Sequence, residues 1–252
     1  MSMQFIDRFS DDADLYARAR PFYPAALLEA ILQHVKGRDF AWDCGTGNGQ
    51  AAVQLKAHFD RVVATDPSEE QIRNALYCEG VEYGVGQAEG VDLPDHSVDL
   101  ITVAQAMHWF DLRKFYGEAR RILKADGALA VFGYSWFYIS PEIDAEVARS
   151  ILAEIEPYWS INNRLLWDGY RGIDFPLIET RLPPMAIHLA WSVTDLIDYV
   201  STWSATREAI RQKGSDFLKK AESALYDLWG GDDRIRPVTM PLFTLFGHFA
   251  KP

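Results

Sequence analysis

The 252-residue sequence predicts an α/β protein built on a doubly wound, mostly parallel sheet. Three observations point to this fold. Short apolar segments alternate with segments of helical periodicity between residues 25 and 133. A glycine-rich turn joins the first apolar segment to the helix that follows it. The next apolar segment, residues 62–65, ends on a carboxylate, Asp66.

The glycine-rich turn is the most informative segment. Residues 43–49 read Asp-Cys-Gly-Thr-Gly-Asn-Gly. Gly45, Gly47 and Gly49 permit a turn whose backbone can approach a ligand with no Cβ in the way. Asp66, at the tip of the next strand, is placed to accept hydrogen bonds from both hydroxyls of a ribose. Together these features predict a site for an adenosine-bearing cofactor.

The spacing of the turn separates classes of cofactor. No Lys-Ser or Lys-Thr follows the glycines, which excludes a Walker phosphate loop. A dinucleotide fingerprint requires a glycine three residues after Gly47, where Gln50 stands instead. A nicotinamide-dependent oxidoreductase is therefore the weaker alternative. A regulatory protein that binds the cofactor without chemistry is a second alternative.

Five segments in order resemble the motifs of class I S-adenosylmethionine-dependent methyltransferases. They are residues 43–49 with Asp66, Gln87-Ala88-Glu89, residues 97–102 running into residues 104–109, residues 121–124 and residues 126–129. The resemblance covers roughly residues 38–135, and the order and spacing of these motifs are more specific than the glycine loop alone.

Two further segments narrow the resemblance to the branch that contains trans-aconitate-type enzymes. These are Tyr-x-x-x-Arg-Pro-x-Tyr-Pro at residues 16–24 and Ala-x-His-Trp-Phe at residues 106–110. The resemblance implies a Rossmann-like, seven-stranded, mostly parallel sheet with an antiparallel last strand and a helical cap. It also implies S-adenosylmethionine as cofactor and a small-molecule acceptor, with O-methylation of a carboxylate as the reaction of this branch.

The motifs assign site residues by resemblance and position. The cofactor residues are Arg20, Asp43, Gly45, Thr46, Gly47, Gly49, Asp66, Pro67, Gln87, Ala88, Glu89 and Gln105. Arg20 is expected to pair with the carboxylate of the methionine part, and Glu89 to accept from the adenine amine. The acceptor residues are Tyr16, Tyr23, His108, Trp109, Trp136 and Arg164. No metal site is expected.

His108 is the candidate catalytic residue. As a donor or base it would face the acceptor, whereas the alternative is a capping or packing histidine. A carboxylate acceptor is ionised at neutral pH and requires no base, but a phenol, amine or carbon acceptor would require one. The aromatic residues after residue 134 favour a planar acceptor, and the arginines available for a polycarboxylate are Arg113, Arg164, Arg171, Arg181 and Arg207.

The remaining segments define four regions: an arm (1–24), a cofactor core (25–139), a helical cap with the sixth strand near 184–191 (140–236) and a final strand (237–252). Ser68, with Gln71 three residues on, and Asp111 are expected to cap helices. The expected cap helices are residues 144–155, 193–200, 205–212 and 217–229. Pro241 indicates an edge or bulged final strand over residues 238–249.

Composition restricts partners and location. The formal net charge of −11 and pI near 5.0 disfavour a nucleic-acid partner. Two cysteines offer neither a metal site nor a disulfide framework. No apolar run approaches the roughly 20 residues of a membrane span, and the N-terminus lacks the pattern of a signal peptide. A cytoplasmic protein is expected, and its oligomeric state is not indicated.

Overall fold

The computed structural model describes residues 19–231 and 234–250. Its strands are listed here in chain order: β1 Phe40–Cys44, β2 Arg61–Asp66, β3 Val81–Val85, β4 Val98–Ala104, β5 Leu123–Tyr134, β6 Ile178–Glu179, β7 Ala186–Trp191 and β8 Arg236–His248. The main order is β3-β2-β1-β4-β5-β8-β6, and β7 pairs with β8. Strands β1 to β5 are parallel, and β8 is antiparallel to β5. The doubly wound, mostly parallel sheet is therefore as predicted.

The central strands explain why the sheet could be recognised. Every residue of β1 is buried, as is every residue of β4 except its last. Strands that are covered on both faces have nearly continuous apolar sequences. From β1 the chain continues to β2 on one side of β1, and it later places β4 on the other side. The order in which strands are added therefore reverses between β1 and β4, although the strands remain parallel. Open α/β sheets bind ligands at the carboxyl end of such a switch point.

The helices of the core are α2 Ala25–Leu32, α3 Gln50–Lys56, α4 Glu69–Arg73, η1 Met107–Trp109 and α5 Leu112–Ile122. Two of the predicted caps are present. The Ser68 side chain accepts from the N–H of Gln71, and Asp111 accepts from the N–H of Lys114. Strand β5 begins directly after α5, because Leu123 already pairs with Val98 across a register shift.

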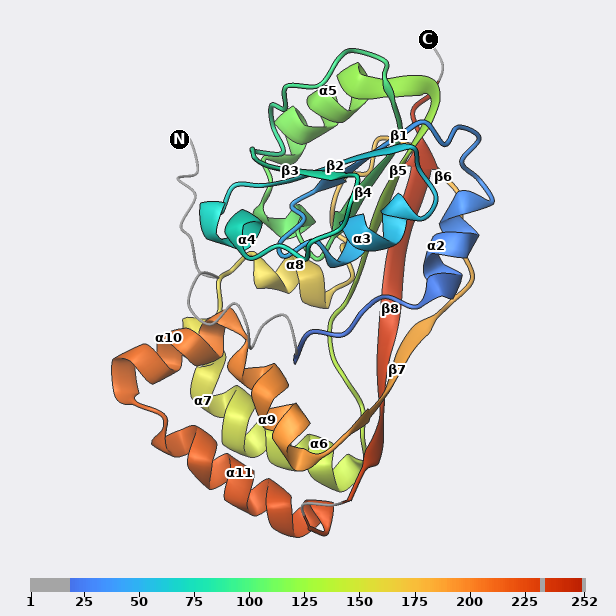
Figure 1. Ribbon diagram of the computed structural model, residues 1–252. Helices are drawn as coiled ribbons and strands as arrows, with labels where there is room; N and C mark the ends of the chain where they lie inside the picture. The colour runs from blue at the N-terminus through green and yellow to red at the C-terminus, as the bar shows by residue number, and fades with distance from the viewer. Residues whose placement is uncertain (1–18, 232–233, 251–252) are drawn as a thin grey trace.

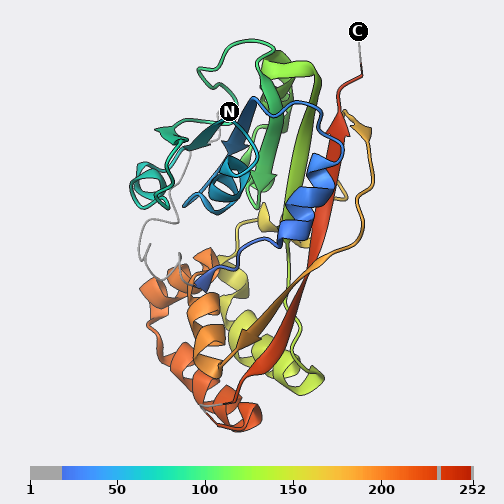
Figure 2. The same cartoon turned by 45° about the vertical axis from the view of Figure 1, so that its right-hand side comes forward.

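The cap lies against the carboxyl edge of the sheet (Figure 1). Its helices are α6 Pro141–Val147, the π-helical η2 Ala148–Leu152, α7 Ala153–Ile155, η3 Glu156–Tyr158, α8 Asn163–Trp167, α9 Val193–Ser201, α10 Ser204–Lys213 and α11 Asp216–Trp229. From the end of β5 the chain runs down into the cap, β7 leads back into the cap at α9, and β8 returns from the cap to the core (Figure 2). Helix α8 lies between the sheet edge and the remaining cap helices.

The expected seven-strand count is wrong, because the sheet has eight strands. Residues 184–191 do contain a strand, β7, but it pairs with the first half of β8, from Arg236 to Pro241. The two-residue β6 occupies the outer place of the core sheet, against Gly247 and His248. A single 13-residue strand, β8, thus pairs with β7 beside the cap and with β5 in the core.

Pro241 indicated an edge or a bulged final strand, and the first of these alternatives is wrong, because β8 has neighbours on both sides. Pro241 is tolerated for a local reason. Thr239 exchanges both backbone hydrogen bonds with Tyr138, and residues two apart in a strand point the same way. The nitrogen of Pro241 therefore faces the gap between Tyr138 and Tyr134, the last residue of β5 paired to β8.

Two apolar clusters pack on the sheet. One joins α2 and α3 to the cap, and the other includes α5 and the segment around Tyr170. Among residues 19–231 and 234–250, no helix combines the length and the apolar character needed to cross a bilayer.

Candidate cofactor and acceptor site

The glycine loop joins β1 to α3 at the switch point. Gly45, Gly47 and Gly49 have φ of +69°, +56° and +88°. A Cβ on Gly49 would lie 2.3 Å from the hydroxyl oxygen of Tyr83, so glycine is required there for packing as well as for conformation. A Cβ on Gly47 would meet nothing closer than Gln71 Oε1 at 3.8 Å. Gly47 therefore leaves bare backbone facing open space.

Asp66 is fixed against this loop. Its Oδ2 accepts from the backbone N–H of Gly47 at 2.9 Å, and its Oδ1 accepts from the N–H of Ser68 at 2.9 Å. Pro67, between them, is half-buried. The carboxylate at the tip of β2 is thus oriented toward the loop.

Asp43 lies behind the loop with no exposed surface. Its Oδ2 accepts from Thr46 Oγ1 at 2.5 Å, and its Oδ1 accepts from Thr102 Oγ1 at 2.6 Å. Burial raises the pKa of Asp43 to about 6, although both hydroxyl hydrogen bonds act in the opposite direction. The side chain therefore ties the glycine loop to β4 and sits behind the cradle.

Two side-chain atoms near the loop have no hydrogen-bond partner among the residues that the structure describes. Asn48 Nδ2 and Gln105 Oε1 are buried without a hydrogen bond within the described residues. Gln105 follows β4 and has φ of +55°, which few residues other than glycine adopt. Leaving such a group unsatisfied costs about 1–3 kcal/mol. An unpaired donor and an unpaired acceptor at the switch point fit a ligand with polar groups of both kinds.

The turn at residues 87–89 lies near the start of α5. Gln87 is exposed and bridges to Gly90, and Ala88 is buried. Glu89 Oε1 accepts from the backbone N–H of Asp111 at 2.7 Å. The carboxylate expected to contact adenine thus holds the chain that leads into α5.

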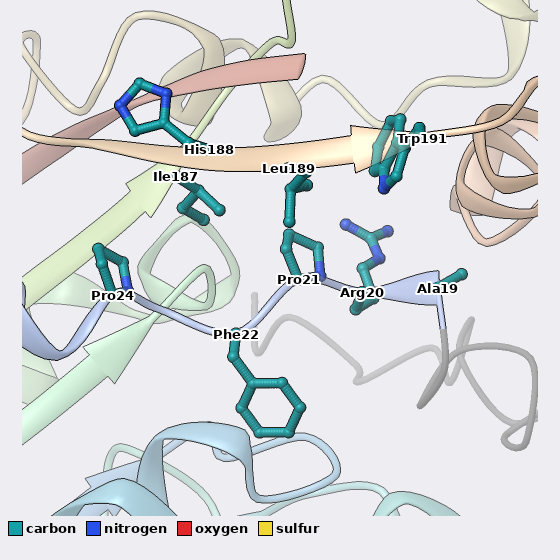
Figure 3. Close-up of a pocket in the computed structure, with 9 residues that line it drawn as sticks. All are labelled: Ala19, Arg20, Pro21, Phe22, Pro24, Ile187, His188, Leu189 and Trp191. Atoms are coloured by element: carbon teal, nitrogen blue, oxygen red, sulfur yellow. The ribbon is translucent and has the colours of Figure 1, made fainter. Parts of the chain in front are cut away.

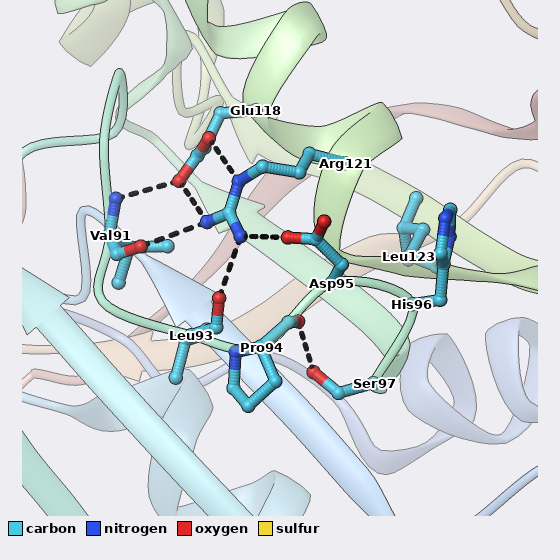
Figure 4. A network of polar contacts seen from close by, with 9 residues as sticks. All are labelled: Val91, Leu93, Pro94, Asp95, His96, Ser97, Glu118, Arg121 and Leu123. Atoms are coloured by element: carbon cyan, nitrogen blue, oxygen red, sulfur yellow. Dashed lines mark hydrogen bonds and ion pairs between the residues drawn. The ribbon is translucent and has the colours of Figure 1, made fainter.

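Arg121 fixes the loop that follows this turn (Figure 4). Its guanidinium donates to the carbonyls of Val91 and Leu93 and to the carboxylates of Glu118 and Asp95. The sequence marked Arg121 only as part of a helix end, because its partners lie up to 30 residues away.

Helix α3 fastens the end of the arm across the sheet edge. Gln50 Nε2 donates to the carbonyl of Arg20 at 3.0 Å, and Gln54 Nε2 donates to that of Tyr23 at 2.8 Å. The Arg20 guanidinium lies 5.3 Å from the ring of Tyr199 in the cap. The Tyr23 ring is buried, 4.7 Å from that of Phe132. Tyr16 lies outside the described residues.

Sequence reasoning missed the role of Gln50 and Gln54. Their spacing of four residues at the start of a helix, which places both amides on one face, was the available signal.

A cleft of about 400 Å³ separates this arm from β7 (Figure 3). It is lined by Ala19, Arg20, Pro21, Phe22, Pro24, Ile187, His188, Leu189 and Trp191. Arg20 and Pro21 point toward β7, whereas Phe22 points away. None of the glycine-loop residues lines this cleft, so it is separate from the cradle.

His108 lies on η1 and is buried. Its Nδ1 is 2.9 Å from the Tyr170 hydroxyl, and Trp109 packs on its ring with centroids 4.8 Å apart. Burial lowers the pKa of His108 to about 3 and raises that of Tyr170. The imidazole is therefore neutral at physiological pH.

Trp136 and Arg164 lie on the cap side of the sheet edge. Trp136 is half-buried just beyond β5, with its ring 5.6 Å from that of Trp167. Arg164 is exposed on α8. Trp136 is therefore packed among the aromatic side chains of the cap, whereas Arg164 is exposed.

Comparison with known proteins decides the family. A family model described as "Methyltransferase domain" matches residues 42–131. A Dictyostelium discoideum protein that carries a methyltransferase name is 34% identical over 249 residues, which cover 96% of this chain and 95% of the relative. The chain belongs to the class I S-adenosylmethionine-dependent methyltransferases.

Two further comparisons agree with this assignment. The solved structure of an Anaeromyxobacter dehalogenans protein described as a type II methyltransferase is 38% identical, with a TM-score of 0.83 over 91% of this chain and 97% of that one. The Saccharomyces cerevisiae protein named "Probable S-adenosylmethionine-dependent methyltransferase CRG1" is 32% identical over 138 residues, 50% of this chain and 45% of the relative.

The methyltransferase uses S-adenosylmethionine, and its cradle fits this cofactor. Gly47 leaves room for a ligand against bare backbone, and the unpaired atoms of Asn48 and Gln105 suit a zwitterionic amino-acid group. Family membership sets aside the nicotinamide-dependent oxidoreductase. Among the described residues, no cluster of His, Cys, Asp and Glu could hold a metal ion.

Proposed function

We propose that this methyltransferase transfers the methyl group of S-adenosylmethionine to a carboxylate oxygen of a small molecule. The observation that carries the proposal is the state of His108. Its ring is buried and bonded to Tyr170, and burial lowers its pKa to about 3, so it has little affinity for a proton removed from an acceptor. A carboxylate is already ionised and needs only to be oriented.

The glycine loop, the arm and the edge of the sheet hold the cofactor in this proposal. Backbone groups of Gly45, Thr46, Gly47 and Gly49 form the cradle, Asp43 supports it, and Asp66 with Pro67 binds the ribose. Gln87, Ala88 and Glu89 border the adenine, whereas Gln105 and Arg20 contact the amino-acid part. When bound, the cofactor supplies a methyl group activated by its sulfonium.

The protein's own contribution is alignment and exclusion of water. Tyr16, Tyr23, His108, Trp109, Trp136 and Arg164 are proposed to border the acceptor. Gln50 and Gln54 support this by fastening the arm over the edge of the sheet. His108 then acts as a neutral hydrogen-bonding group. The net charge of −11 supports a small-molecule acceptor rather than a nucleic acid.

The test is turnover of donor labelled in its methyl group against carboxylates, phenols and amines. We expect label in a base-labile methyl ester, and less product from the Asp66→Ala variant when the donor is limiting. Label that appears only in an ether or a methylamine would overturn the carboxylate assignment. A panel without any turnover, despite donor binding, would favour the non-catalytic alternative.

A further inference from the structure

Four tryptophans form a closed ring in the cap, which we call the tryptophan box. Trp136 follows β5, Trp159 follows η3, Trp167 ends α8, and Trp203 precedes α10. Around the ring, the centroids of neighbouring indoles are 5.6, 5.3, 5.7 and 6.1 Å apart, in the order 136-167, 167-159, 159-203 and 203-136. Four separate segments of the chain thus converge on one aromatic site.

The box differs from an ordinary apolar core in its burial. Of its members only Trp203 is buried, at 5% exposure, whereas Trp136, Trp159 and Trp167 are half-buried. Tyr199, also in the cap, is 2% exposed. Full burial of an aromatic ring is strongly stabilising. The three indoles that pack together without becoming fully buried leave apolar surface of the kind that lines ligand sites.

The box adjoins the edge where transfer would occur. A Cβ on Gly133, near the end of β5, would lie 2.5 Å from Gln105 Oε1, so the end of β5 is in contact with the Gln105 side chain. Trp136 is three residues further along. Three residues of extended chain span at most about 10 Å. A molecule with one end in the box can therefore present its other end beside Gln105.

Positive charge borders the box. The Arg20 guanidinium lies over Tyr199, whose ring is 5.6 Å from that of Trp203. Arg207 follows Trp203 by one helical turn, and its backbone N–H donates to the Trp203 carbonyl. The two Nη atoms of its guanidinium are buried. Aromatic faces alone would also accept an ammonium group. The proposed methylation of a carboxylate selects an anionic guest over an ammonium.

We infer that the acceptor is an aromatic carboxylic acid, whose ring stacks against the half-buried indoles of the tryptophan box while its carboxylate points toward the end of β4. This rests on the proposed carboxylate methylation and specifies its substrate class. A carboxylate oxygen forms a bond to the methyl carbon as the carbon–sulfur bond breaks. The bonding pair stays on sulfur, the sulfonium becomes a neutral thioether, and no proton is released.

An aliphatic polycarboxylate suits this site less well. Such a substrate needs several cations and no aromatic surface. Four of the five arginines that could serve it, Arg113, Arg164, Arg171 and Arg181, are exposed.

Three probes test the inference on the full chain saturated with S-adenosylhomocysteine: 2-naphthoate, its cationic counterpart 2-naphthylmethylamine, and trans-aconitate. We expect 2-naphthoate to quench tryptophan fluorescence and bind more tightly than the other two. Trp167→Leu should weaken its binding roughly tenfold, since a stacked aromatic pair contributes about 0.5–1.5 kcal/mol beyond its buried area. Trp159→Phe serves as a milder second variant if Trp167→Leu does not fold. Tyr77→Leu, at a tyrosine that is 92% exposed, is the control and should change nothing.

The outcomes distinguish failure of the aromatic-acceptor inference from failure of the proposed function. Preference for trans-aconitate or for the amine, or unchanged naphthoate affinity in both tryptophan variants, would overturn the aromatic acceptor. Loss of S-adenosylhomocysteine binding in the unmodified protein would instead refute the proposed function.

Discussion

Asp43→Asn removes a carboxylate that the fold buries completely between Thr46 and Thr102. The asparagine retains the shape of the side chain and can still hydrogen-bond to both hydroxyls. What it loses is the charge, and with it the proton equilibrium that burial has shifted.

The magnitude follows from that shift. Burial raises the pKa of Asp43 from 3.8 to about 6, and each pKa unit is worth 1.36 kcal/mol, so the total is about 3 kcal/mol. The native state binds this proton more tightly than the unfolded state. Its contribution to stability is therefore present in full below pH 3.8 and is lost as the pH rises through about 6.

Urea unfolding of both proteins at pH 4 and pH 7.5 measures the effect. The free energy of unfolding of the variant minus that of wild type should be about 2.4 kcal/mol higher at pH 7.5 than at pH 4, because at pH 4 the carboxyl is already partly ionised in the unfolded state. Asp92→Asn, at an exposed carboxylate, should show no such change. A difference between Asp43→Asn and wild type that is the same at both pH values would refute the reasoning. Because the charge destabilises the fold at neutral pH, we expect it to serve the cradle, and the variant should bind S-adenosylhomocysteine more weakly.

Three further predictions address the loop, the ribose and the imidazole. Asp66→Ala should lower S-adenosylhomocysteine affinity in calorimetry by about 10- to 100-fold, since a hydrogen bond to a charged group is worth about 1.5–3 kcal/mol, with an unchanged circular dichroism spectrum; unaltered affinity would remove the ribose assignment. Gly49→Ala should lower the free energy of unfolding by about 1–3 kcal/mol, because the residue has a φ of +88° and the new Cβ would lie 2.3 Å from the Tyr83 hydroxyl oxygen; Gly84→Ala, whose Cβ would meet no atom within 4 Å, should not lower it. The pH dependence of kcat/KM should contain no inflection from His108 between pH 5.5 and 8.5, because its pKa is about 3; an inflection near pH 6.5 that disappears in His108→Gln would contradict its assignment as a neutral group.

The core strands were predictable because each is a short apolar segment between turn residues, and burial on both faces demands such a sequence. Helix starts were also predictable where a side chain caps them, as Ser68 and Asp111 do. These signals are local, since every residue that determines them lies within about four positions.

Strand pairing was not predictable in the same way. The alternation in residues 184–191 indicated a strand but not its partner, and β7 pairs beside the cap instead of in the core sheet. Strand β6 has two residues, too few to show any period. The length of β8 lets it pair with β5 and β6 in the core and with β7 beside the cap, and this length depends on where Tyr138 and β7 meet it.

The candidate site divides along the same line. The glycines, Asp43 and Asp66 were identified because a cofactor loop requires them at fixed spacing. The partners of the other residues lie far away in sequence, as with Glu89 and Asp111, 22 residues apart, and His108 and Tyr170, 62 apart. Only the fold reveals that these side chains are already engaged.

Thermal unfolding with S-adenosylhomocysteine and, separately, NADH tests the cradle most directly. At 100 times its Kd, a ligand that binds only the native state adds about 2.7 kcal/mol of stability. We predict that S-adenosylhomocysteine stabilises the protein by this amount, that Asp66→Ala reduces the effect to about 0.4–1.4 kcal/mol at the same ligand concentration, and that NADH does nothing. Stabilisation by NADH, without any by S-adenosylhomocysteine, would contradict the assignment of the glycine loop to a methyl donor.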